Sequence, residues 1–180
     1  MTSRLVDNLG TLRASGPYHA VRAAMGGMLR RTDFGIVHIS LERDHMHLIA
    51  EAHDAMALGN GMRAFQSSAA RRLNRTLGRR GRVFEDRYHS VAVTSPRQAR
   101  RAMNYVLNNF RRHQLDDGME TRFWEVDYFS NGPTFDGWRE GMVDLPHGYR
   151  PLPVARARTW LLRVGWRKAG SISQRAMPGR

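Results

Sequence analysis

Apolar residues along the first 112 positions recur at two different spacings, one typical of strands and one typical of helices. Alternating or short continuous apolar runs predict strands at 2–6, 34–41, 45–51 and 83–93. Apolar residues three or four positions apart predict helices at 18–31, 61–77 and 95–112. The first six predicted elements follow the order βαββαβ, which is that of a ferredoxin-like antiparallel sheet. The seventh is a helix that packs across this sheet, so we expect an α+β fold.

Beyond His113 the regular spacing ends. Residues 114–149 are rich in Asp, Gly and Pro but also hold aromatic residues that need burial, which predicts an ordered, irregular segment. These aromatic residues include Phe123, Trp124, Tyr128, Phe129, Phe135 and Trp138. An amphipathic stretch at 158–168 predicts one more helix, and residues 171–180 are predicted to form a loose tail. We therefore expect one domain at 1–113 and a C-terminal extension, 114–180, packed on it.

An excess of basic residues changes this picture from a generic α+β domain to one that binds nucleic acid. The sequence has 29 Lys and Arg residues against 16 Asp and Glu, a net charge of +13, and Lys168 is its only lysine. The stretch 71–112 holds 12 arginines, opposed only by Glu85 and Asp86. Guanidinium groups bind phosphate through a rigid fork and stack on bases, so we expect a nucleic-acid partner. The expected DNA contacts are Arg71, Arg72, Arg75, Arg79, Arg80, Arg82 and Arg87.

What the sequence lacks excludes several kinds of chemistry. Its 180 residues include no cysteine, so disulfides, cysteine nucleophiles and cysteine-bound zinc are excluded. No apolar run approaches the ~20 residues of a membrane span, so we expect no membrane partner. The N-terminus lacks the apolar core of a signal peptide. We therefore expect a cytoplasmic protein, associated with the nucleoid when it is bound to DNA.

Two pairs of residues are candidates for chemistry. In the predicted strand 45–51, His45 and His47 point to the same face, because side chains alternate along a strand. Taken alone, this pair fits a hairpin strand that merely contains two histidines as well as it fits a metal site. In the predicted helix 95–112, Tyr105 and Asn109 project from the same side one turn apart. A tyrosine beside a core stripe is usually packing, but an asparagine is unexpected there because it is a poor helix former.

Three sequence blocks, in this order and at these spacings, resemble a known family. They are DHMHLI at 44–49, GRVFEDRYH at 81–89, and SPRQ followed by YVLNN at 95–109. Together they are similar to the single-tyrosine transposases of the HUH superfamily, in particular the REP-associated tyrosine transposases and their insertion-sequence relatives. The resemblance covers residues 2–112. It identifies residues 1–113 as a transposase catalytic domain.

The resemblance implies a role for each candidate residue. His45, His47 and Asn109 match the ligands of a divalent metal, Mg²⁺ or Mn²⁺, and Tyr105 matches the nucleophile. The implied activity is cleavage and rejoining of single-stranded DNA next to a hairpin. The implied intermediate is a 5′-phosphotyrosine, in which the tyrosine oxygen is bonded to the 5′-phosphate of the cut strand.

Two other functions fit parts of the pattern. A domesticated transposase that binds DNA hairpins without cutting them would show salt-sensitive binding but no covalent adduct. A metal-dependent hydrolase would use the two histidines with a carboxylate such as Glu51 or Asp54, and it would be indifferent to Tyr105. The sequence leaves the oligomeric state open, with a homodimer among the options.

Overall fold

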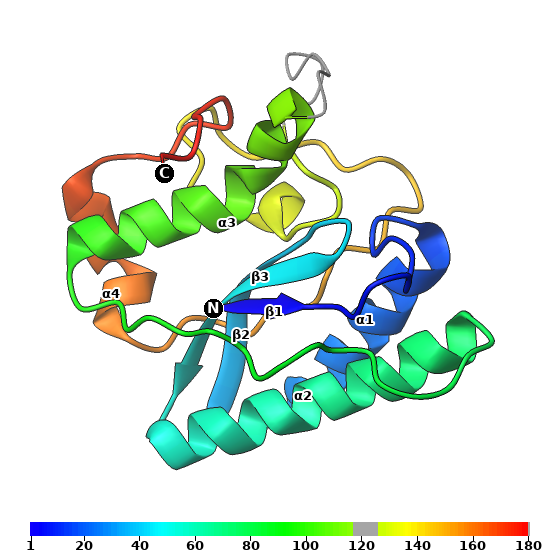
Figure 1. Cartoon of the computed structure of the whole chain (residues 1–180). Helices are drawn as coiled ribbons and strands as arrows, with labels where there is room; N and C mark the ends of the chain where they lie inside the picture. The colour runs from blue at the N-terminus through cyan, green and yellow to red at the C-terminus, as the bar shows by residue number, and fades with distance from the viewer. Residues whose placement is uncertain (117–125, 180) are drawn as a thin grey trace.

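Three antiparallel strands form the centre of the fold, and the central one carries the histidine pair (Figure 1). This computed structural model describes residues 1–116 and 126–179. The strand order in the sheet is β1-β3-β2. The strands are β1 (Thr2–Arg4), β2 (Phe34–Leu41) and β3 (His45–Ala52). The main helices are α1 (Ser15–Met28), α2 (Ala55–Thr76) and α3 (Pro96–Asp116).

Helices cover both faces of the sheet, with α1 and α2 on one face and α3 on the other (Figure 1). Because side chains alternate along β3, Met46 and Leu48 enter the core beneath α1 and α2, whereas Ile49 packs with α3. His45 and His47 share the α3 face with Ile49. The predicted α+β class is confirmed by this arrangement.

The predicted strand at 83–93 is wrong, because this segment forms only two isolated bridges at the edge of the sheet. They join Leu5 to Phe84 and Thr2 to His89. Between the bridges the backbone bends at 85–87, where a charged Glu-Asp-Arg run has no apolar face to bury. In addition, β1 is only three residues long and offers few backbone partners. The sheet therefore has three strands instead of the four predicted, with an irregular segment along its β1 edge.

The three predicted helices of the first domain are present, with shifted bounds. The largest shift is in α2, which begins at Ala55 instead of residue 61. Asp54 caps it, since its carboxylate accepts a hydrogen bond from the Ala57 backbone N–H at 2.7 Å. Gly59 and Gly61 obscured this start in the sequence because glycine is a poor helix former. No helix among the described residues is both long enough and apolar enough to cross a membrane.

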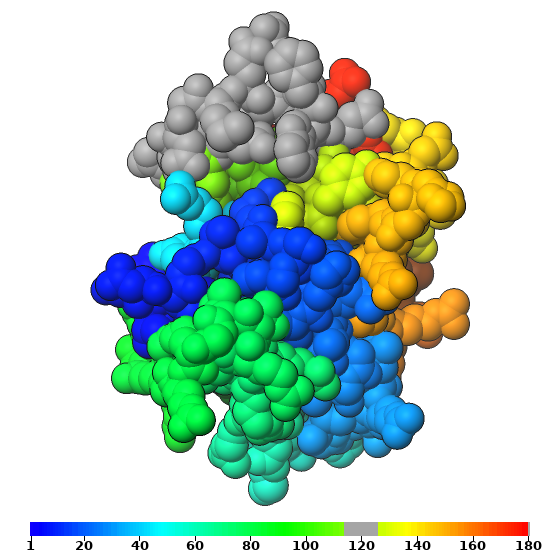
Figure 2. Space-filling model, turned by 90° about the vertical axis from the view of Figure 1, so that its right-hand side faces the viewer, coloured from blue at the N-terminus to red at the C-terminus, as the bar shows by residue number. Residues whose placement is uncertain are grey.

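The C-terminal extension is tied to the first domain by buried contacts. Asp127 accepts two hydrogen bonds from the Arg13 guanidinium, at 2.7 and 2.8 Å. Figure 2 shows the chain around residue 150 (orange) against α1 (blue), where the Tyr18 hydroxyl donates to the Arg150 carbonyl at 2.8 Å. Leu152 joins the buried apolar cluster of the first domain. The extension therefore contributes to the same core as the sheet.

Two short helices replace the single helix predicted at 158–168. They are α4 (Trp160–Arg163) and η3 (Gly165–Ala169), and η3 packs along α3. The first residues of the predicted loose tail are also held in place. Ile172 is fully buried, and the Arg111 guanidinium donates to the Gln174 carbonyl at 2.9 Å.

The irregular segment after α3 is organised around two buried aromatic residues, Phe135 and Trp138. The Trp138 indole donates to the carbonyl of Gly132 at 2.8 Å, at the start of η2 (Gly132–Thr134). Tyr128 and Phe129 are half-buried. Phe123 and Trp124, which were also expected to be buried, lie outside the described residues.

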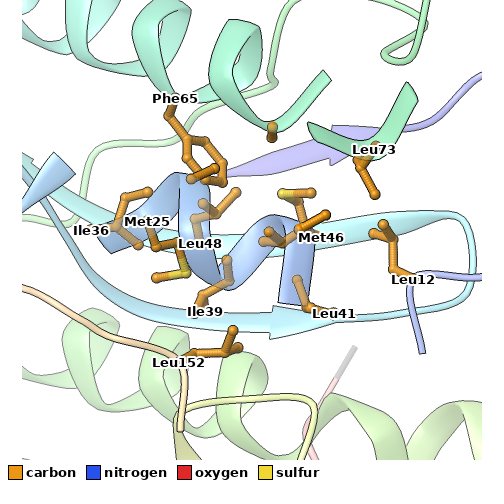
Figure 3. Packing of buried hydrophobic residues seen from close by; sticks show 14 of the residues in the cluster. Leu12, Met25, Ile36, Ile39, Leu41, Met46, Leu48, Phe65, Leu73 and Leu152 are labelled. Carbon is orange, nitrogen blue, oxygen red and sulfur yellow. The ribbon is translucent and has the colours of Figure 1, made fainter. Parts of the chain in front are cut away.

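The core between the sheet and α2 leaves no room at one glycine. Figure 3 shows Phe65 of α2 and Met25 of α1 gathered with Leu48 of β3. At Gly61 the helix comes so close to β2 that an added Cβ would lie 2.2 Å from Cγ of the buried Phe34. At Gly59, two residues earlier, an added Cβ would meet open space.

This close approach predicts opposite effects of two similar substitutions. Gly61→Ala should lower the free energy of unfolding by about 1–3 kcal/mol, because the new methyl group overpacks the Phe34 ring. The control Gly59→Ala should raise it by about 0.5–1 kcal/mol, because alanine is the better helix former. Urea unfolding followed by circular dichroism measures both. Equal effects of the two substitutions would contradict the packing described here.

Candidate active site

The two histidines of β3 converge on one point at the surface of the sheet that faces α3. Their Nε2 atoms are 3.0 Å apart. The other ring nitrogen of each histidine, Nδ1, has its own partner. Nδ1 of His45 lies 2.7 Å from a carboxylate oxygen of Asp44, and Nδ1 of His47 lies 3.0 Å from the hydroxyl oxygen of Thr2. Thr2 reaches His47 because the two residues are paired across β1 and β3. Partners of this kind fix the orientation of imidazoles that bind metals.

Helix α3 places a row of polar side chains over the histidine pair. The helix begins as the sequence predicts, with the Ser95 hydroxyl accepting a hydrogen bond from the Gln98 backbone N–H at 3.3 Å. The Tyr105 ring packs edge-on against His47, with 4.9 Å between ring centroids. Asn109, one turn further on, is 1% exposed. The four residues singled out in the sequence as nucleophile and metal ligands therefore lie in one site.

Two further residues of the site were missed in the sequence. His113 lies one turn beyond Asn109, and its ring nitrogen lies within 4.8 Å of those of His45 and His47. The four-residue spacing between Asn109 and His113 indicates that both lie on the same side of a helix. His113 was missed because the predicted helix ends at residue 112, one residue before it. Glu42, read as part of a polar turn, is buried beside α3 and has an oxygen 3.4 Å from Nδ2 of Asn109.

Burial controls the charges of these groups. Burial, followed by the proximity of His45, lowers the pKa of His47 to about 3. The His47 ring is therefore neutral at pH 7, with a lone pair available to a metal. Burial also raises the pKa of Tyr105, against the opposing effect of Arg112, so the phenol keeps its proton. Burial raises the pKa of Glu42 as well, with Asp127 adding to the increase.

The site fits a divalent metal ion. The amide oxygen of Asn109 is buried and has no hydrogen-bond partner among the described residues. A buried acceptor left unpaired is costly, and a cation beside it would remove that cost. The amide nitrogen faces Glu42, whose carboxylate can only accept when ionised, which leaves the oxygen for another partner. Two imidazoles and an amide oxygen form a nitrogen–oxygen donor set suited to a divalent ion.

The seven arginines predicted to contact DNA come from other elements than the four candidate residues. They belong to the second half of α2 and to the loop and segment that follow it. Figure 2 shows this loop (green) at the opposite end of the visible face from the last described turns of α3 (yellow-green). No hydrogen bond or ion pair between described residues joins any of the seven to the histidine pair or Tyr105. Their contact with DNA stays a prediction.

Comparison with known proteins gives the family. The family model described as "Transposase IS200 like" matches residues 15–109, more than half of the chain. The chain belongs to the IS200-like transposase family, and it is accordingly a transposase that acts on DNA. The match includes the histidine pair, Tyr105 and Asn109, and it leaves out β1, His113 and the C-terminal extension. No curated protein and no solved structure matches the chain.

The low pKa of His47 predicts an acid-sensitive fold when no metal is present. The ring titrates at about 3 in the folded chain and at 6.5 in its ordinary state. The unfolded chain therefore binds more protons between these pH values, and stability is lost as the pH falls below 6.5.

We expect the free energy of unfolding in EDTA to fall by about 2 kcal/mol more between pH 7 and pH 5 in the unsubstituted chain than in His47→Gln. Urea unfolding at the two pH values measures this difference. An equal fall in both proteins would show that His47 is not buried in its neutral form.

Proposed function

We propose that this transposase cleaves and rejoins single-stranded DNA next to a hairpin, with Tyr105 as its nucleophile. The observation that carries the proposal is the position of the Tyr105 ring, which packs against His47 while Asn109 lies one turn further along the same helix. Cleavage of a DNA phosphodiester by a protein side chain requires a nucleophile and a positive charge that stabilises the transition state, and a tyrosine beside a candidate cation site supplies both. The family match supports the transposase class, and the geometry of these residues supports the chemistry.

In the proposed cleavage step, the Tyr105 oxygen attacks the phosphorus of the scissile phosphate. A bond forms between the tyrosine oxygen and phosphorus, and the bond from phosphorus to the 3′ oxygen breaks. The phenol loses its proton, and the departing 3′ oxygen takes one up. The products are a 5′-phosphotyrosine and a free 3′-hydroxyl. Because one phosphoester replaces another, a 3′-hydroxyl can reverse the step and rejoin the strand without ATP.

We assign the metal to His45, His47 and Asn109, as Mg²⁺ or Mn²⁺, with His113 close enough to be a further ligand. When bound, the ion polarises the scissile phosphate and stabilises the charge that develops in the transition state. Asp44 and Thr2 hold the two imidazole rings in position. The contact of Glu42 with the amide nitrogen of Asn109 leaves the amide oxygen available as a metal ligand.

The two carboxylates named for the hydrolase alternative, Glu51 and Asp54, are both engaged in other contacts. Glu51 already accepts hydrogen bonds from the backbone N–H groups of Arg158 and Thr159, at 2.7 and 3.0 Å. Asp54 caps the first turn of α2. Neither carboxylate is left to complete a metal site with the histidines. A transposase that binds DNA without cutting it is the second candidate, and the covalent adduct distinguishes it from the first.

Substitution of the proposed nucleophile provides the first test. Tyr105→Phe should abolish cleavage of single-stranded hairpin DNA and the denaturation-resistant protein–DNA adduct, because it removes only the attacking oxygen. Affinity for the DNA should change less than about threefold, since the phenol contributes little to phosphate binding. The assay is a denaturing gel of labelled DNA incubated with protein and Mn²⁺.

Tyr88→Phe is the matched control, because Tyr88 is half-buried on the segment beside β1 and has no assigned role. It should cleave at the unsubstituted rate. An adduct that persists in Tyr105→Phe would assign the nucleophile to another residue.

The metal assignment gives a separate prediction. His45→Ala combined with His47→Ala should reduce cleavage at least a thousandfold while DNA binding is kept, because the ion acts on the reaction more than on affinity. EDTA should have the same effect on the unsubstituted chain. The control His53→Ala removes an exposed imidazole from the loop after β3 and should leave cleavage intact. Full activity of the double variant in EDTA would overturn the metal role.

A further inference from the structure

Helix α3 carries more than the nucleophile and the amide ligand. Five polar residues follow one another along this helix at four-residue intervals, and they are Arg97, Arg101, Tyr105, Asn109 and His113. Each step advances about 6 Å along the helix and turns by about 40°, so these side chains form one slowly winding row. Exposure falls along the first four of these residues, because the two arginines are exposed, the tyrosine is half-buried and the asparagine is buried, and His113 beyond them is half-buried. The row therefore leads from the candidate active site out to solvent at the arginines.

At its outer end the row borders an open hollow of about 790 Å³ between the first turns of α3 and the end of η3. Four basic side chains and no acidic one line the hollow, and they are Arg97, Arg100, Arg101 and Lys168. Three of them come from the helix of the nucleophile. The fourth is the single lysine of the sequence, and it comes from the C-terminal extension.

The contacts of these side chains leave positive charge available in the hollow. Arg100 is fixed by hydrogen bonds to the carbonyl oxygens of Gly170 and Ser171, which do not neutralise it. The Lys168 ammonium lies 5.2 Å from the centre of the Trp160 ring. Arg97 and Arg101 have no ion-pair partner among the described residues. A hollow of this size with several positive charges at its wall favours a polyanion over a single small anion.

We propose that this hollow binds backbone phosphates of the single-stranded DNA on one side of the bond that Tyr105 cleaves. This proposal rests on the proposed function. Arg101 lies about 6 Å and Arg97 about 12 Å along the helix from Tyr105. Successive phosphates of a strand are at least ~3.4 Å apart along its axis, so the hollow receives phosphates within about four nucleotides of the scissile one. The extension thereby completes a substrate path that begins on the helix of the nucleophile.

The first test compares two double variants that lose the same charge. Arg97→Ala with Arg101→Ala should weaken binding of single-stranded hairpin DNA about tenfold, and should lower the salt slope of the binding constant by about 1.4, or ~0.7 for each lost phosphate contact. The control, Arg30→Ala with Arg63→Ala, removes two exposed arginines associated with α1 and α2 and should change affinity less than twofold. Tyr105→Phe in every protein keeps the DNA intact during the measurement.

Equal loss of affinity in both double variants would show a general effect of net charge and would overturn the proposal. Inorganic phosphate at millimolar concentration should compete only weakly with the DNA for the protein. This competition should be equally weak whether or not Arg97 and Arg101 are substituted. If phosphate alone displaced the DNA completely in a manner that depended on these arginines, the hollow would be a single-anion site, which would also contradict the proposal.

The single lysine allows the position of the strand to be mapped. An abasic-site aldehyde in the DNA condenses with an amine, losing water, and cyanoborohydride reduces the imine to a stable amine. We expect crosslinking to Lys168 when the aldehyde lies within about four nucleotides of the cleavage position on one side only. Lys168→Arg, which keeps the charge, should bind normally but lose this crosslink. Crosslinking that does not depend on position, or crosslinking found by mass spectrometry only at the N-terminal amine of Met1, which lies beside Leu48, would overturn the proposal.

Failure of this proposal is separable from failure of the proposed function. If the unsubstituted chain forms no covalent adduct but the arginine pair and Lys168 give the expected binding and crosslinks, the hollow stands and Tyr105 is not the nucleophile. If the adduct forms but neither the arginine variants nor the crosslinks behave as expected, the nucleophile stands and the hollow does not bind the strand.

Discussion

The candidate site depends on the pairing register of β3. Because side chains alternate along a strand, the residues that place His45 and His47 under α3 also place Met46 and Leu48 in the core on the other face. Pairing with β1 brings Thr2 beside His47, and pairing with β2 places Ser40 opposite it. A slip of one residue would turn both imidazoles into the apolar core and bring Met46 to the surface of the site. The buried methionine and leucine therefore hold the histidines in position.

A second constraint is the four-residue spacing along α3. It brings Tyr105 against the ring of His47, and it places Asn109 one turn deeper, where Glu42 holds its amide. One rigid helix thus carries the proposed nucleophile and one proposed metal ligand, and it carries the exposed arginines Arg97 and Arg101 at its other end. Relative positions along a helix do not change easily. In the proposed mode of binding, one helix therefore sets the distance from the reacting phosphate to its flanking phosphates.

Local periodicity explains which parts of this site were predictable from the sequence. The shared face of His45 and His47 follows from strand alternation, and that of Tyr105 and Asn109 follows from helical spacing. Glu42 was missed because its role depends on a turn and a helix that meet only in three dimensions. The strand at 83–93 was wrong because its existence depended on pairing with a very short β1. The arginine cluster at 71–87 is visible in the sequence, but its position relative to the histidine pair is not. That position depends on which face of the sheet α2 covers, and α2 covers the face opposite α3.

The central claim is that DNA becomes covalently attached to Tyr105. The most direct measurement is mass spectrometry of tryptic peptides after the protein has reacted with single-stranded hairpin DNA and the DNA has been digested with nuclease. Cleavage after Arg101 and Arg111 releases the peptide 102–111, in which Tyr105 is the only tyrosine. The account predicts a nucleotide attached to this peptide through the tyrosine oxygen. A nucleotide on any other peptide, or DNA cleavage with no modified peptide, would contradict it.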